Sequence, residues 1–364
     1  MKSRSQLLAI LGMGLLLIGI AGCWDDEPDT LRANALILMV SHKAGEKSWN
    51  WRFYFPNPTV TVSSLSQIKP EEEFYTTSVQ APSLEQAYTQ VQQHLARDLY
   101  LGQLEVVIVS DTLTTKDLAS FLNAYNREGT LPKTAYILVA SSPLSKMAVV
   151  TPQVSIPAVY WEKYFDCKDC QPELLAHPIW KAWDDIVTPD MSPAIPYAGF
   201  DKIAQLAVYR SVGSPVIFSR TETLGWAYLM GKVKKESLSI ISPVGTVTLG
   251  RIHGTVHSRV EAVNQHLQAF VQIHLTSDVA QWESSAAMTN NTLSRIQTLA
   301  EHRVLLECIA AINKANMTHT DPFGYGRRLS FEQDGPPSMA QVHWEQIDAQ
   351  VSVTMQIRTS GGNV

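Results

Sequence analysis

The stretch DCKDC holds two thiols, Cys167 and Cys170, at a spacing that suits three kinds of chemistry. Such a pair can serve as a redox couple, as half of a zinc site, or as a short local disulfide. A structural zinc ion needs four ligands, and no second cysteine pair or nearby histidine pair accompanies this one. A redox-active cysteine pair is expected at the start of a helix, and Pro172, close after Cys170, argues against that position. We therefore favour a surface disulfide, then free thiols, and last metal or redox chemistry.

The other candidate chemical groups do not form a catalytic pattern. His253 and His257 would be separated by about 13 Å on a strand, too far to bind one ion. Asp184 and Asp185 are adjacent, so their side chains diverge on any regular element. The stretch FGYGRR (323–328) could hold an anion, but a turn after the preceding helix explains it better. With no nucleophile elbow, phosphate loop or dinucleotide fingerprint, the sequence predicts no enzyme.

A further cysteine, Cys23, directly follows an apolar run over residues 7–22 that Lys2 and Arg4 precede. The run is shorter than the roughly 20 residues that a membrane-spanning helix needs, and its layout is that of an export signal. The order Ile-Ala-Gly-Cys at its end resembles a bacterial lipobox. The resemblance implies a signal peptide over residues 1–22 and a diacylglycerol group on Cys23, which would hold the protein on a membrane surface. A plain signal with a chance cysteine and an uncleaved short anchor are the alternatives.

Composition describes a globular chain. Of its 364 residues, 45% are hydrophobic and 17% are charged, and no long tract of low complexity is present. The formal net charge of -5 argues against nucleic acid as a partner. After residue 22 no apolar run approaches membrane-spanning length. We therefore expect a folded body of two or three domains that enters the membrane only through its lipid.

The first half alternates buried strands with amphipathic helices, which predicts an N-terminal α/β domain over residues 23–150. Ser83 is expected to cap a helix, with Gln86 completing a capping box. Leu84, Ala87, Tyr88, Val91 and Leu95 form its apolar face. The predicted strands are 35–40, 51–58, 104–110 and 134–140, and the second predicted helix is 114–128.

The second half differs from the first in composition and in the periodicity of its apolar residues. Residues 151–204 are rich in proline and aromatic residues, which predicts a connector or a small second domain. From residue 205 to 361 we expect a C-terminal α+β domain with antiparallel strands. Its predicted elements are a hairpin of 206–210 with 215–219, a half-buried strand 267–275, a long helix 292–313 and a strand 351–357. Leu293, Ile296, Leu299 and Ala300 are expected to face inward from that helix, and Cys308 to lie in the core. The fold class is thus α+β and multi-domain.

Several landmarks together resemble the Ger(x)C family, the lipoprotein C-subunits of spore germinant receptors. Near the start, GCWD places Trp24 and Asp25 after the lipobox cysteine, as in that family. The block from residue 84 to 113 looks like the family's helix, arginine and strand block. Its best anchors are Arg97, Tyr100, Gly102, Leu104 and Leu113.

The second half of the chain carries further landmarks of the same family. LAVYR (206–210) and LGWAYLMGKV (224–233) look like the start of its C-terminal domain. DPFGYG (321–326) is similar to its DpfgxG motif, and Trp344 with the last strand is similar to its ending. The motif positions here are Asp321, Phe323, Gly324 and Gly326. Gln103 and Gln205 depart from the family pattern, and DCKDC is not one of its signatures.

The resemblance implies a fold, a location and partners. It implies three mixed α/β domains, each a sheet with surrounding helices, attached by lipid to the outer face of the spore inner membrane. It also implies assembly with integral membrane A- and B-type subunits in a complex that senses nutrients and triggers germination. No catalytic activity and no cofactor other than the lipid on Cys23 are implied. The alternative is an exported solute-binding lipoprotein of a transporter, although such proteins normally have two similar lobes, whereas these halves differ. A secreted lipoprotein hydrolase would need a nucleophile and base that the sequence does not show.

Overall fold

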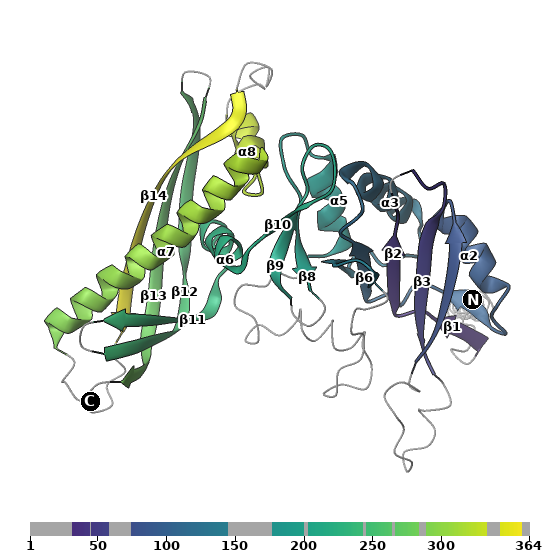
Figure 1. The fold of residues 1–364 in the computed structure, drawn as a ribbon, viewed down its shortest axis with the longest axis horizontal. Helices are drawn as coiled ribbons and strands as arrows, with labels where there is room; N and C mark the ends of the chain where they lie inside the picture. Colours follow the sequence, from purple (N-terminus) through teal and green to yellow (C-terminus); the bar gives the residue numbers. More distant parts are fainter. Residues whose placement is uncertain are drawn as a thin grey trace, which may run out of the picture.

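The computed structural model describes residues 31–43, 45–57, 74–144, 177–199, 203–242, 245–263, 266–283, 289–332 and 343–358. Two sheets with their helices lie side by side, the N-terminal one at the right of Figure 1 and the C-terminal one at the left. The predictions for Cys23, Trp24, Asp25, Cys167 and Cys170 lie outside the described residues. The mixed α/β fold expected from the sequence is confirmed.

The N-terminal half is built on an eight-stranded sheet with the order β10-β9-β8-β7-β6-β2-β3-β4. Its central strands β2, β6, β7 and β8 are parallel, and antiparallel pairs close both edges. The strands are β2 (Ile37–Ser41), β3 (Trp49–Pro56), β4 (Phe74–Ala81), β6 (Val106–Ser110), β7 (Tyr136–Ala140), β8 (Ala194–Ala198), β9 (Ile203–Val208) and β10 (Val216–Phe218). A separate parallel pair joins β1 (Arg32–Asn34) to β5 (Asp98–Tyr100).

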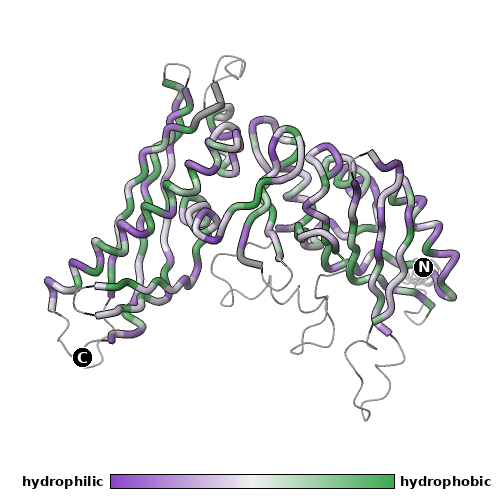
Figure 2. Tube along the Cα trace, in the orientation of Figure 1, coloured by the Kyte–Doolittle hydropathy of each residue, from purple (hydrophilic) through white to green (hydrophobic). Residues whose placement is uncertain are grey.

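Three helices pack on one face of this sheet: α2 (Leu84–Gln92), α3 (Thr115–Arg127) and α5 (Ile179–Val187). Alternate strand residues such as Leu38 and Val40 point toward these helices, while Ile37 and Met39 join an apolar cluster on the other face. Both faces of the central strands are therefore buried. This explains their continuous apolar sequences, which Figure 2 shows as a concentration of hydrophobic colour.

The predicted helix starts are confirmed, with one difference. The Ser83 side chain accepts the Gln86 backbone N–H, but the full reciprocal capping box forms at α3, between Thr114 and Asp117. Leu84, Ala87 and Val91 are buried as expected. Tyr88 is instead 39% exposed, and its hydroxyl donates to the Leu99 carbonyl oxygen.

The segment with proline and aromatic residues contributes regular structure to the N-terminal sheet. Within residues 177–199, α5 packs beside α3, and β8 pairs in parallel with β7. Pro178 stands at the N-cap of α5, where a missing backbone N–H does no harm. This portion of the predicted connector is thus an integral part of the eight-stranded sheet.

The C-terminal half is a four-stranded sheet, β11-β12-β13-β14, with three helices. Long strands run the length of this half, and α7 lies along them (Figure 1). The elements are α6 (Arg220–Leu229), β11 (Lys234–Ser242), β12 (Gly245–Val263), β13 (His266–Glu283), α7 (Asn290–Thr318), α8 (Tyr325–Glu332) and β14 (His343–Arg358). The strict alternation predicted for 267–275 is confirmed, because Leu267, Ala269, Val271, Ile273 and Leu275 are all buried.

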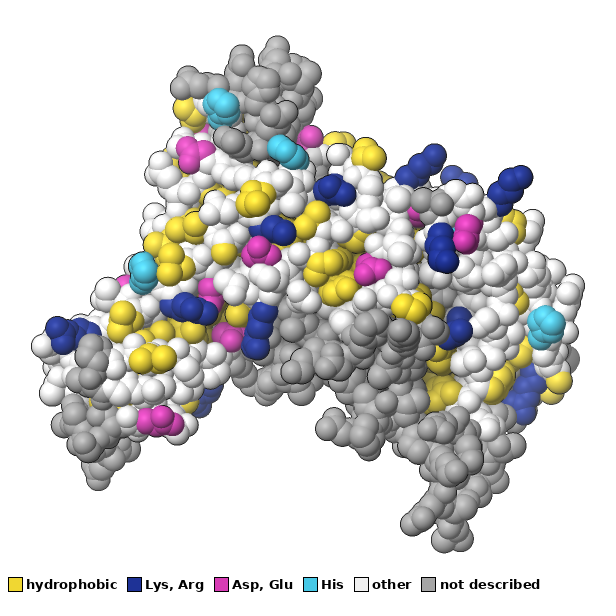
Figure 3. All heavy atoms as spheres, viewed as in Figure 1, with side chains coloured by type: hydrophobic (Ala, Val, Ile, Leu, Met, Phe, Trp, Pro, Cys, Tyr) yellow, Lys and Arg dark blue, Asp and Glu magenta, His cyan; other side chains and the backbone are white. Residues whose placement is uncertain are grey.

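Two expectations for this half were wrong. The last strand, β14, is parallel to β13, although an antiparallel sheet was expected. Residues 284–342, which include α7 and α8, connect these two strands and allow the parallel pairing. In addition, Leu299 does not face the core, since it is 39% exposed on α7 together with Leu306 and Ile309. Figure 3 shows hydrophobic side chains scattered among charged ones along this helix.

Strand β9 belongs to both halves. Leu206 and Val208 lie in the C-terminal core, whereas Ala207, and Tyr209 directly after the strand, lie in the N-terminal core. The hairpin predicted from 206–219 is confirmed by antiparallel pairing of β9 with β10. The expected domain boundary at residue 205 falls inside this strand, and the division of the chain into domains stays a prediction.

Helices α6 and α7 meet at a glycine. A Cβ atom built on Gly225 would lie 1.9 Å from the Glu307 carbonyl oxygen and 2.4 Å from its carbonyl carbon. Backbone atoms of α7 thus occupy the space that any other side chain would need. Beneath this contact, Cys308 is fully buried, as the sequence predicted.

We predict that Gly225→Ala destabilises the protein by about 3 kcal/mol, because α6 must move away from α7 to admit the methyl group. Gly129→Ala is the matched control, since no heavy atom lies within 4 Å of its added Cβ. Chemical denaturation of both variants measures the effect. Equal stability of the two variants would show that the helices are not held at this distance.

Candidate functional site

The N-terminal motif block surrounds the ring of Tyr100. The Arg32 guanidinium lies 4.7 Å from the centre of this ring, and the Tyr100 carbonyl oxygen accepts the Ala35 backbone N–H at 3.0 Å. A Cβ on Gly102 would lie 2.4 Å from the same ring, so any other residue there would have to displace the Tyr100 side chain. Arg97 is exposed, and its carbonyl oxygen accepts a hydrogen bond from the Gln92 side chain. These motif residues therefore shape the turn between α2 and β6.

The C-terminal motif forms the start of α8. The buried carboxylate of Asp321 accepts the backbone N–H of Phe323 at 3.1 Å and of Gly326 at 2.8 Å. Gly324 has a φ of +67°, a conformation that favours glycine. Phe323 and Tyr325 stack at 5.2 Å between ring centres and are buried. In this motif Asp321 caps α8, and the two aromatic rings pack in the core beneath the cap. The geometry is that of a turn, as expected from the sequence.

The same motif joins the two halves of the molecule. Ser192, just before β8, donates its backbone N–H to the Asp321 carbonyl oxygen, and the Ser192 hydroxyl accepts the Asp321 N–H, both at 3.0 Å. From α6, the Trp226 indole donates to the Pro322 carbonyl oxygen at 2.8 Å. From α8, Arg327 pairs with Asp184 on α5 at 3.0 Å. We call this set of contacts the junction.

A cluster of titratable groups around the buried Asp185 of α5 lies beside the junction. Lys181 pairs with Asp185, whose side chain is 2% exposed, and His177 Nε2 lies 3.5 Å from the other Asp185 oxygen. Burial raises the pKa of Asp185, but the interaction with His177 and the hydrogen bond from Lys181 outweigh burial and leave the pKa below its usual value. Burial lowers the pKa of His177 and, together with repulsion from Lys181, that of Lys232. The carboxylate of Asp185 is thus the negative centre of a cluster of basic groups.

Burial also acts on Asp321 itself. It raises the pKa of this carboxyl to about 6, although four backbone N–H groups of the motif oppose the shift. Unlike Asp185, Asp321 has no cationic side chain among the groups that shift its pKa. Ionisation of Asp321 therefore costs folding free energy at neutral pH.

The junction is suited to holding two bodies together rather than to chemistry. Its carboxylates accept hydrogen bonds from the backbone or from cations of the same chain. Within the part of the chain that the structure describes, no group of three His, Cys, Asp or Glu side chains could hold a metal ion. Arg327 and Arg328 belong to the stretch for which the sequence favoured a turn over an anion site, and they contact Asp184 and the Ser258 carbonyl oxygen.

The structure brings together only some of the residues that the sequence singled out. Asp321, Phe323, Gly324 and Gly326 meet in the junction. The Tyr100 block lies beside β1, at the far end of the N-terminal half from α8 in Figure 1, and Trp344 lies in β14. Sequence reasoning missed His177, Lys181 and Lys232, although the helical spacing of Lys181 and Asp185 was a usable signal.

We predict that Asp321→Asn changes how stability depends on pH. The native carboxyl has a pKa of about 6, above the ordinary value of 3.8. At a pH between these two values the carboxyl is protonated in the folded protein and ionised in the unfolded one, so unfolding releases a proton. The wild type should therefore lose up to about 3 kcal/mol relative to the variant as the pH rises from 4 to 7. Urea denaturation of both proteins across this range measures the difference. A difference that stays constant would contradict the raised pKa.

Comparisons with known proteins follow the two halves of the chain. Residues 32–199 match the family described as spore germination protein N-terminal domain, and residues 216–361 match spore germination B3/GerAC like, C-terminal. No curated protein gives a sequence match. Among solved structures, one titled as the crystal structure of the GerBC protein is similar, with a TM-score of 0.56 and 11% sequence identity, over 88% of this chain and 96% of that chain. At this identity the structural likeness concerns the fold, whereas the two domain matches cover most of the chain. The chain belongs to the GerAC-like family of spore germination proteins.

Proposed function

We propose that this protein is a lipid-anchored subunit of a nutrient germinant receptor in the spore inner membrane. It would dock onto integral membrane A- and B-type subunits at the outer face of that membrane and so help to trigger germination. The observation that carries the proposal is the order of features along the chain. A lipobox ending at Cys23 is followed by the N-terminal and then the C-terminal domain of the germination family.

In this proposal Cys23 carries the lipid that anchors the protein to the membrane. Among the described residues, no helix is long and apolar enough to cross a membrane. A diacylglycerol group carries two acyl chains, and two chains hold a protein on a bilayer far more firmly than one. Anchoring would confine the folded body to the surface where its partners lie and raise its effective concentration there.

Binding rather than catalysis is the proposed mode of action. The family of receptor C-subunits is generally non-catalytic. The motif residues of the described chain cap a helix, fit against an aromatic ring or join the two halves, which are structural roles. Such a body can present a fixed surface to partner subunits, and this supports a role in assembly.

We predict that Cys23→Ala releases the protein from the membrane and slows germination through the receptor concerned. The substitution removes the lipid acceptor and leaves the described contacts of the folded body unchanged. With partner affinity near micromolar, occupancy should fall at ordinary expression and recover on overproduction, because the tether no longer supplies the local concentration. Membrane fractionation, with germination measured across nutrients at graded expression, tests this.

Cys308→Ala is the matched control for loss of a thiol. Cys308 is fully buried in the C-terminal core, so its removal should leave membrane retention unchanged. Co-purification of partner subunits should be lost with Cys23→Ala and kept with Cys308→Ala. Retention of the Cys23→Ala protein on membranes would contradict the anchor. Normal anchoring without any co-purified membrane protein would contradict the receptor role.

A further inference from the structure

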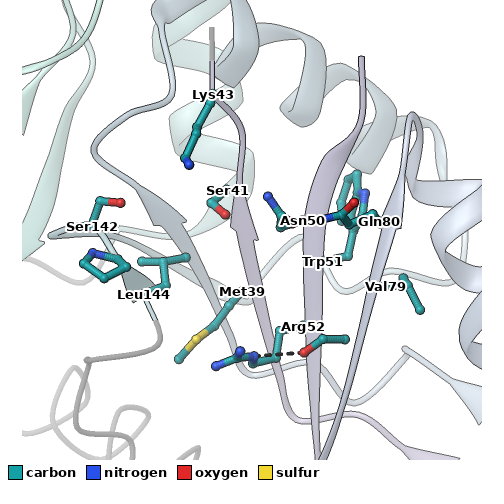
Figure 4. Close-up of a pocket in the computed structure, with 12 residues that line it drawn as sticks. Met39, Ser41, Lys43, Asn50, Trp51, Arg52, Val79, Gln80, Ser142 and Leu144 are labelled. Carbon is teal, nitrogen blue, oxygen red and sulfur yellow. Dashed lines mark hydrogen bonds between the residues drawn. The ribbon is translucent and has the colours of Figure 1, made fainter. Parts of the chain in front are cut away.

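A pocket of about 450 Å³ opens on the face of the eight-stranded sheet that does not carry α2 and α3. Strands β2, β3 and β4 form its floor, and the segment after β7 forms one wall. Figure 4 shows its lining side chains. The volume is within the range of small-molecule sites, about 300 to 1,000 Å³.

Strand register arranges the floor in two rows, each with one side chain from each strand. The direct cross-strand partners lie on the same face of the sheet, so each row is continuous. One row is Met39, Arg52 and Ser78, and the other is Ser41, Asn50 and Gln80. Within the second row, the Gln80 amide donates to the Asn50 side-chain oxygen at 3.0 Å, which fixes both amides.

Arg52 is a positioned cation at the centre of the first row. Its Nε donates to the Ser78 hydroxyl at 3.0 Å, which orients the guanidinium group (Figure 4). This bond leaves the two terminal nitrogens of the guanidinium for another acceptor. A planar guanidinium fork matches the two oxygens of a carboxylate better than it matches a single acceptor.

A second cation, Lys43, follows the end of β2 and lines the same pocket. In Figure 4 its ammonium group points toward Ser41, at the other end of the pocket from the guanidinium of Arg52. No Asp or Glu is among the described lining residues, and neither cation forms an ion pair within the described chain. The pocket therefore has a net positive lining that no carboxylate of the described chain neutralises.

The remaining wall is apolar. Pro143 and Leu144 lie beside Met39, and both Leu144 and Met39 belong to the buried apolar cluster on this sheet face. The Ser142 hydroxyl adds one polar group at the edge. A ligand that fits this lining carries a negative head for the cations and a short apolar body for the wall.

We propose that this pocket binds a small organic carboxylate. The carboxylate accepts hydrogen bonds from the Arg52 guanidinium, the apolar body packs against Met39 and Leu144, and Lys43 adds attraction at the mouth. A free amino acid fits less well, because its ammonium group would enter a positive site. This inference goes beyond the proposed receptor role and does not depend on it.

Isothermal titration calorimetry on the purified full chain tests the proposal with 4-methylpentanoate as the probe. We expect a dissociation constant of about millimolar or tighter, which weakens as salt is raised. The neutral isostere 4-methylpentanamide should bind at least about tenfold more weakly, because it lacks the charge. Inorganic phosphate and L-leucine should also bind more weakly than the probe.

Variants identify the site. Arg52→Gln should weaken the probe at least about tenfold, since it removes a charge-assisted hydrogen bond pair. Lys43 is exposed, so Lys43→Gln should weaken it about threefold without affecting folding. The matched control is Lys116→Gln on the exposed side of α3, which should leave binding unchanged. Circular dichroism of each variant checks that it is folded.

Several results would overturn the proposal. These are no heat of binding with the wild type, equal binding of the amide and the carboxylate, or tighter binding of phosphate. If Lys43→Gln and Lys116→Gln weaken binding equally, the probe is attracted by the overall charge of the protein and not by this pocket. Failure of the receptor role would leave these measurements unaffected, because they need only the purified chain.

Discussion

Strand β9 must bury its two faces in two different cores, and the rest of the structure depends on this constraint. Side chains alternate across a strand, so Leu206 and Val208 enter the C-terminal core while Ala207, and Tyr209 directly after the strand, enter the N-terminal core. Moving one half relative to the other would expose one of these sets to water, at roughly 25 cal/mol for each Å² of apolar surface. A single strand thereby makes the relative position of the halves part of the hydrophobic core.

Burial of β9 holds the two halves together, and the hydrogen bonds of the junction fix their relative orientation. Hydrophobic contact is not directional, but the paired bonds between Ser192 and Asp321 are satisfied in only one arrangement. Leaving one such buried group without its partner costs about 1 to 3 kcal/mol. Because Asp321 also caps α8, the residue that orders the motif is the one that attaches it to the N-terminal half. The motif is therefore best understood as a joint between the two halves of the molecule.

Patterns in the sequence predicted those helices and strands whose formation depends on interactions between neighbouring residues. Ser83 marks a helix start, and the alternation over 267–275 marks a half-buried strand, because caps and periodicity are properties of neighbouring residues. The pairing of β14 with β13 could not be predicted in this way, since a half-buried strand has the same alternation in either direction. The junction was beyond local patterns altogether, because Asp184 and Arg327 are 143 positions apart in the chain. The family resemblance identified Asp321 but not what it contacts.

The charges of the N-terminal half are used in two different ways. At the junction and beside it each carboxylate meets a cation or backbone donors, so Asp184 and Asp185 are neutralised within the chain by Arg327 and Lys181. A neutralised cluster stabilises the joint but has little remaining attraction for a charged ligand. On the opposite face of the sheet, Arg52 is held by a neutral hydroxyl, which orients its charge without cancelling it. Arg52 therefore keeps its attraction for an anion on the sheet face opposite α5, where no carboxylate of the described chain pairs with it.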